Sequence, residues 1–104
     1  MKKLPPIHPG EILLEEFMKP LGLSQNALAR DLGVDPRTVN QIVNGKRAVT
    51  AIMALRLARY FRMTPGFWMN LQARYDLEIA KDAAEADIKR TVKPCAMKLS
   101  HTAA

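Results

Sequence analysis

The sequence predicts an all-α fold, in which a five-helix bundle is followed by a C-terminal extension. Apolar residues recur at three- and four-residue steps along most of the chain, which is the spacing of one helix face. Residues that cap helix N-termini precede four of the expected helices, at Ser24, Asp35, Thr50 and Thr64. With 104 residues the chain has room for one modest core. We therefore expect one domain over residues 1–80 and an extension with a tail over residues 81–104.

The first helix is expected from about Pro9 to Pro20. Residues 1–7 form an extended lead-in, because consecutive prolines disfavour helix. The inner stripe is expected at Ile12, Leu13 and Phe17, with Glu11, Glu15 and Glu16 facing outwards. His8 stands just before this helix without a second metal ligand at helical spacing. A capping or turn role is therefore favoured over a metal or catalytic role.

The stretch from Ser24 to Gly45 is typical of two short helices joined by a tight turn. Ser24 caps the first helix, and Gly33 ends it where a positive φ is expected. Asp35 caps the second helix, and Pro36 takes the first position, where no N–H is needed. The second helix is apolar on one side and polar on the other, with side chains that bond to phosphates and base edges. A polar helix presented in this way fits the major groove of DNA.

The last two helices follow the same signals. Thr50 should cap a helix over Ala51–Phe61 that buries Ile52, Leu55, Leu57, Ala58 and Phe61. Thr64 should cap another helix, which starts at Pro65, passes Ile79 and carries an apolar stripe at Phe67, Trp68, Leu71, Tyr75 and Ile79.

Two interpretations of that stripe stay open. In the first, Phe67, Leu71 and part of Trp68 belong to the core. In the second, an exposed remainder, Trp68 and Tyr75, marks a dimer or partner face. From Lys81 to about Arg90 the residues still favour helix, and beyond Pro94 the pattern weakens. This segment is a helical extension with a loose tail, or a segment that becomes ordered on a partner.

The positive charge is concentrated in the centre of the chain. The net charge is +6, and the segment from Ser24 to Arg62 holds seven basic residues and two acids, a net of +5. This segment contains the two short helices, so the charge indicates a polyanionic partner. Lys46 and Arg47 are expected to contact phosphates, whereas Arg56, Arg59 and Arg62 are expected to be solvated or ion-paired.

The sequence lacks the groupings that catalysis requires. We find no nucleophile beside a base, no convergent carboxylates and no glycine-rich phosphate loop. Cys95 and His101 do not form a metal site by themselves, and a single cysteine excludes an internal disulfide. No apolar run has the length of a membrane span or the form of a signal peptide. We therefore expect a cytoplasmic protein that is not an enzyme, with no cofactor, no metal and no membrane contact.

Several short motifs carry a family resemblance. Gln25, Leu28-Ala29, Gly33-Val34, Val39 with Ile42, and Asn44-Gly45-Lys46 together resemble the helix-turn-helix of the lambda-repressor-like (Xre-type) DNA-binding family. The flanking motifs, His8-Pro9-Gly10-Glu11 and the stretch from Thr64 to Leu77, are similar to the HigA/VapI-type antitoxins of toxin–antitoxin modules. The resemblance covers about residues 7–80. It implies a bacterial antitoxin that neutralises a small ribonuclease toxin and represses its own operon.

The candidate DNA-binding residues lie on and around the second helix of the motif. Arg37, Thr38 and Gln41, with Asn40 and Asn44 beside them, are expected to face the base edges. Gln25, Lys46 and Arg47 are expected to hold the phosphate backbone, and the resemblance assigns backbone and base contacts to Gln25 and Gln41. Pro36 departs from the family, because many members carry a base-reading polar residue there. A homodimer would place two such helices about 34 Å apart on a near-palindromic operator.

Two other functions remain open from the sequence. One is a stand-alone transcriptional regulator of the same fold that has no toxin. The other is a protein-interaction module that has lost DNA binding, for which binding would show no steep dependence on salt. The surface for a cognate toxin is also open, since the first helix, the last helix and the tail are all candidates.

Overall fold

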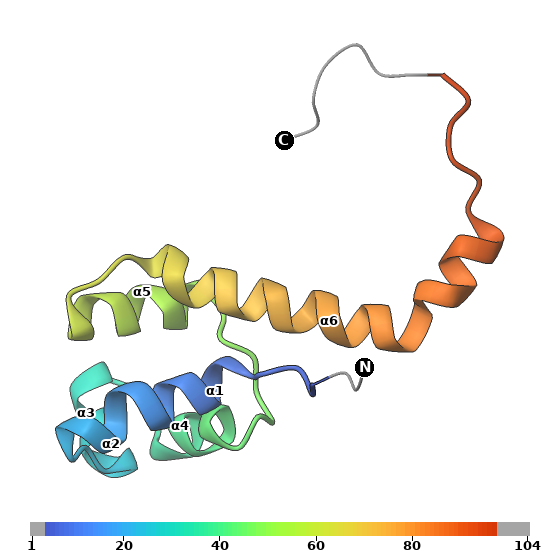
Figure 1. The fold of residues 1–104 in the computed structure, drawn as a ribbon. Coiled ribbons are helices and arrows are strands. Elements are labelled where there is room, and N and C mark those ends of the chain that lie inside the picture. The colour runs from blue at the N-terminus through green and yellow to red at the C-terminus, as the bar shows by residue number, and fades with distance from the viewer. Residues whose placement is uncertain (1–3, 98–104) are drawn as a thin grey trace.

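The computed structural model describes residues 4–97, and in this range all regular structure is helical. The elements are α1 (Pro9–Ile12), η1 (Leu13–Met18), α2 (Lys19–Leu21), α3 (Gln25–Leu32), α4 (Pro36–Val43), α5 (Ala51–Phe61) and α6 (Pro65–Thr91). In Figure 1, α1 to α4 form one group. Helix α5 and the first half of α6 form a second group, which lies on one side of the first. The rest of α6 projects beyond the body. The predictions for residues 1–3 and 98–104, including the one for His101, lie outside the described residues.

The first predicted helix is confirmed as one run of three segments from Pro9 to Leu21. Its middle segment, η1, is a π-helix, which the sequence analysis did not predict. Leu13 and Met18 are buried, while Ile12 and Phe17 are only partly buried. Gly22 ends the run with a φ of 65°, in the left-handed region that glycine adopts without steric cost.

Side-chain caps set the starts of three helices, as predicted. Ser24 Oγ accepts a hydrogen bond from Ala27 N at 3.0 Å, and Asp35 Oδ1 accepts one from Arg37 N at 2.7 Å. Thr50 Oγ1 accepts one from Met53 N at 3.2 Å, and α5 has the predicted bounds. The prediction for Thr64 is wrong in one respect: α6 begins after it, but its hydroxyl makes no capping hydrogen bond. Pro65 at the first helical position is the remaining start signal.

The face that α5 presents to the core differs from the prediction. Ile52 and Leu55 are 67% and 58% exposed, so their predicted burial is wrong. The buried residues of α5 are Met53, Ala54, Leu57 and Ala58. Because α5 carries apolar side chains all round, periodicity alone does not decide which of them face inwards.

The N-terminal half of α6 closes the core. Trp68 is fully buried, with its ring centroid 5.1 Å from that of Phe17 and 5.1 Å from that of Phe67. Phe67 itself stays 38% exposed, which corrects the prediction that it would be buried. One turn further on, Gln72 is buried and its Oε1 accepts a hydrogen bond from Val49 N at 2.7 Å. This bond ties α6 to the segment that follows α4.

None of the helices in residues 4–97 combines the length and the hydropathy that crossing a membrane requires.

Candidate nucleic-acid interface

Helix α4 is held against the first helix by a contact that only glycine permits. A Cβ built on Gly10 would lie 1.7 Å from the carbonyl oxygen of Ile42, far inside van der Waals contact. The missing side chain therefore lets α1 approach the backbone of α4 closely. Val39 and Ile42 face the core, which leaves the opposite side of α4 to solvent.

Arg37 and Thr38 lie at the start of the solvent-facing side of α4. The backbone N–H of Arg37 donates to the Asp35 cap, while its side chain is exposed. Within residues 4–97 the guanidinium of Arg37 makes no hydrogen bond or ion pair, so its donors remain available to a ligand. Thr38 is half-buried beside it. An arginine in this state can donate two parallel hydrogen bonds to a guanine edge or to a phosphate.

Three amide side chains form a chain across α3 and α4. Asn40 Nδ2 donates to Gln25 Oε1 at 3.0 Å, and Asn44 Nδ2 donates to Asn40 Oδ1 at 3.3 Å. Both polar atoms of Asn40 are therefore engaged within the protein, and Asn40 positions the side chains of Gln25 and Asn44. The NH₂ group of Gln25 still has donor capacity, as phosphate binding at the start of α3 requires.

Gln41 and Arg47 form a second pair at the other end of the surface. Arg47 Nε donates to Gln41 Oε1 at 2.7 Å, which fixes the direction of the Gln41 amide. The Gln41 NH₂ is left to donate to a base acceptor, and the terminal nitrogens of Arg47 are left to donate to a phosphate.

Lys46 and Arg47 lie on a loop whose two ends are anchored. Lys46 N donates to the Gln41 carbonyl at 2.8 Å, and Val49 N donates to the buried Gln72. Gly45 makes the turn directly before Lys46, with a φ of 73°. Both cationic side chains are exposed next to α4. The structure thus brings together all eight predicted DNA-binding residues, which are Gln25, Arg37, Thr38, Asn40, Gln41, Asn44, Lys46 and Arg47, on or beside α4. Their contact with DNA stays a prediction.

Comparison with known proteins identifies the family of the chain that carries this surface. A helix-turn-helix family model matches residues 14–68. Virulence-associated protein I of Dichelobacter nodosus is 52% identical over 79 residues, covering 76% of this chain and 73% of the relative. Antitoxin HigA-1 of Vibrio cholerae is 37% identical over 98 residues, covering 94% of this chain and 91% of its own.

The fold is similar to a solved structure along most of the chain. That structure is the Pseudomonas aeruginosa antitoxin HigA with the higBA promoter, which is 48% identical in sequence. The match has a TM-score of 0.84 and covers 86% of this chain and 97% of the HigA chain. The chain belongs to the HigA/VapI family of helix-turn-helix proteins. The predicted resemblance and the all-α fold are both confirmed.

In this member of the HigA/VapI family, His8 caps the first helix and lies against the loop that carries Lys46 and Arg47. Its Nδ1 accepts a hydrogen bond from Gly10 N at 2.9 Å, so the predicted capping role is confirmed. Its ring packs edge-on against Tyr75 of α6, with centroids 4.9 Å apart. Burial lowers the pKa of His8 below the usual 6.5, and a backbone hydrogen bond with Arg47 and the charge of Asp76 partly offset this shift.

We predict that His8 makes stability depend on pH. Because its pKa is lower in the folded state, the unfolded chain binds more protons as the pH falls below about 6.5. The contribution of His8 is thus present above that pH and is lost as the pH falls through the folded pKa. Urea unfolding near pH 7.5 and near pH 5 measures how much the free energy of unfolding falls between the two. This fall should be smaller for His8→Asn, which retains a capping side chain, than for the parent protein. An equal fall in both proteins would contradict this role of His8.

The predicted partner face on α6 needs correction. Trp68 is fully buried in the core and is not available to a partner, so its assignment to that face is wrong. The bundle accommodates the indole because Phe17, Phe61 and Phe67 surround it. Tyr75 is half-buried against His8, and its role in a partner contact stays a prediction.

The sequence analysis missed two residues that position this surface. Gly10 was treated only as part of a motif, although a helix-forming segment that contains a glycine is a signal of close backbone approach. Gln72 was not singled out, and no local pattern distinguishes a buried amide from an exposed one. Within residues 4–97 no three His, Cys, Asp or Glu side chains gather where they could hold a metal ion.

Proposed function

We propose that this chain is a sequence-specific DNA-binding antitoxin that acts as a homodimer and represses its own operon. The observation that carries the proposal is the outward side of α4, where Arg37 and the Gln41 NH₂ are free to donate between two groups of phosphate-binding side chains. The relatives named above support it, since two of them are called antitoxins and one was solved with promoter DNA. Neutralisation of a ribonuclease toxin is the second part of the proposal and rests on the family.

In the proposed mechanism, phosphate contacts set the register before the bases are read. Gln25 at the start of α3 and Lys46 and Arg47 after α4 grip the backbone on either side of the major groove. The pairs Gln25–Asn40 and Gln41–Arg47 are formed within the protein, so less side-chain entropy is lost when DNA binds. Arg37 and Gln41 then read base edges on each half-site.

The salt dependence of DNA binding tests the proposal. We expect specific retention of the duplex upstream of the gene, with an affinity that falls steeply as salt increases, because bound cations on DNA are released. Lys46→Ala and Arg47→Ala should each reduce the slope of log K against log salt by about one per protomer. Lys19→Ala, which removes an exposed cation on α2, is the matched control and should leave the slope unchanged.

A second arm of the experiment addresses the toxin. The product of any adjacent toxin-sized reading frame is added to the protein–DNA mixture, and a changed affinity or stoichiometry supports the antitoxin. Binding that the neighbour does not alter would leave a stand-alone regulator. Absence of specific binding at low salt would contradict the DNA-binding function itself.

A further inference from the structure

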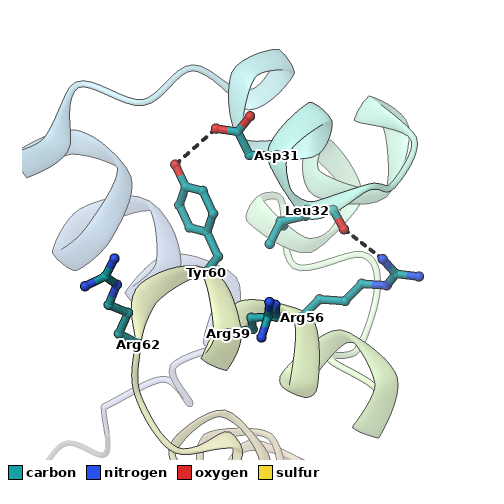
Figure 2. Close-up of a pocket in the computed structure, with 6 residues that line it drawn as sticks. All are labelled: Asp31, Leu32, Arg56, Arg59, Tyr60 and Arg62. Atoms are coloured by element: carbon teal, nitrogen blue, oxygen red, sulfur yellow. Dashed lines mark hydrogen bonds between the residues drawn. The ribbon is translucent and has the colours of Figure 1, made fainter.

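A polar cleft lies between the end of α3 and helix α5. Its volume is about 690 Å³, which is in the range of sites for small molecules. Figure 2 shows the residues that line it, which are Asp31, Leu32, Arg56, Arg59, Tyr60 and Arg62. All of them except Leu32 are polar or charged, so the cleft favours a charged ligand over an apolar one.

The cleft is remote from the proposed DNA contacts along both of its helices. Gln25 begins α3, whereas Asp31 lies near the end of that helix. Lys46 precedes α5, whereas Arg59 and Arg62 lie at the far end of it. The proposed DNA contacts therefore leave the arginines of the cleft without a function.

Three guanidinium groups border the cleft. Arg56 Nη1 donates to the Leu32 carbonyl at 2.8 Å, so this side chain is fixed on the backbone and departs from the prediction of plain solvation or ion pairing. Arg59 and Arg62 are exposed and make no hydrogen bond or ion pair within residues 4–97. Figure 2 shows Arg59 between the other two. Since a guanidinium has five N–H donors, all three groups keep donors for a ligand.

Asp31 is the acidic residue of the cleft, and its charge is partly balanced within the protein. Its Oδ1 lies 3.6 Å from Arg30 Nε, and its Oδ2 accepts a hydrogen bond from the Tyr60 hydroxyl at 3.4 Å. The three arginines that line the cleft therefore leave it with a net positive charge.

The backbone of Arg62 supplies an independent observation. Arg62 ends α5 with a φ of 56° and a ψ of 56°, in the left-handed region that strains residues other than glycine. Glycine is the usual residue where a helix ends in this conformation. An arginine here lowers the stability of the fold, and strain of this kind is found preferentially at functional sites.

We propose that this cleft binds a small anion that carries two or three consecutive phosphate groups. Guanidinium groups donate paired hydrogen bonds to phosphate oxygens. Arg56, Arg59 and Arg62 follow one another over about 9 Å along the direction of α5, which fits a chain of phosphates better than a compact anion. The inference goes beyond the proposed function and does not depend on DNA binding.

Calorimetric titration of the full chain with inorganic triphosphate tests the site. At about 0.15 M salt, where long-range attraction is screened, we expect saturable binding of one triphosphate per chain and weaker binding of monophosphate. Arg59→Ala and Arg62→Gly should each weaken triphosphate binding about tenfold, because each removes charge-assisted hydrogen bonds. Arg37→Ala removes an equal charge from an exposed arginine outside the cleft and should leave this affinity unchanged.

Arg62→Gly distinguishes binding from folding. Glycine adopts the left-handed conformation without strain, so the variant should unfold at the same temperature as the parent or higher while it loses affinity for triphosphate. A parent chain that does not bind triphosphate, or an equal loss in Arg37→Ala, would overturn the proposal. Equal affinity for citrate, a compact polyanion, would overturn the assignment to a phosphate chain.

The same variants on operator DNA keep the two proposals separate. Arg59→Ala and Arg62→Gly should leave the salt slope of DNA binding unchanged. A slope reduced by about one per protomer, as expected for Lys46→Ala, would assign these arginines to DNA phosphates and overturn the proposed cleft ligand. Absence of operator binding in every protein would contradict the proposed function and would leave the triphosphate result standing.

Discussion

Replacing Gly10 with alanine is expected to destabilise the fold by about 3 kcal/mol or more. The new methyl group would overlap the Ile42 carbonyl oxygen, which is backbone and cannot rotate away. Helix α1 must then separate from α4, and the position of α4 on the body changes with it. Thermal or urea unfolding should show the loss of stability, and DNA affinity should fall with it even where the chain is still folded.

Gly66→Ala is the matched control for this substitution. Gly66 lies in the first turn of α6, and nothing stands within 4 Å of a Cβ built on it. Alanine is a better helix former than glycine by up to about 1 kcal/mol, so this variant should be as stable as the parent or slightly more stable. Similar stability of Gly10→Ala and Gly66→Ala would show that α1 and α4 do not meet as described.

Replacing Arg37 with alanine is expected to weaken binding to the specific operator by about 1–3 kcal/mol and to relax specificity at one base pair of each half-site. The side chain is exposed and makes no hydrogen bond or ion pair within residues 4–97, so folding should be unaffected. Competition binding against operators altered at single positions would measure both effects. Equal weakening on specific and random duplexes would instead assign Arg37 to a phosphate.

Asn40→Ala tests whether Asn40 contacts bases itself or positions the side chains of Gln25 and Asn44. Because Asn40 is bonded to Gln25 and Asn44, its loss should weaken binding to every sequence without changing the preferred base at any position. A changed base preference would make it a direct reader and would contradict the role assigned to it by these two hydrogen bonds.

Local signals in the sequence were sufficient for most helix boundaries. Ser24, Asp35 and Thr50 each bond to an amide two or three residues away, so the information that starts α3, α4 and α5 lies within a few residues. Most of the candidate DNA surface was predictable for the same reason, since all of its residues except Gln25 occur on α4 or directly after it, and Gln25 is the first residue of α3.

Contacts between distant segments were not predictable in this way. Whether Ile52 or Met53 faces the core depends on where α6 lies, because both alternatives give α5 an apolar side. The burial of Trp68 depends on three phenylalanines from η1, α5 and α6. The bond from Val49 N to Gln72 spans 23 residues, and no periodicity marks it.

The continuity of α6 from Pro65 to Thr91 has a thermodynamic consequence for regulation. One rigid element holds Gln72, which anchors the loop of Lys46 and Arg47, and the exposed half of α6 that begins near residue 80. We expect the binding of a partner to this exposed half to be coupled to DNA binding, and such coupling is reciprocal. Whatever factor the partner adds to operator affinity, the operator must add to the affinity for the partner. A partner protein that captured the end of α6 would therefore change repression without touching a base.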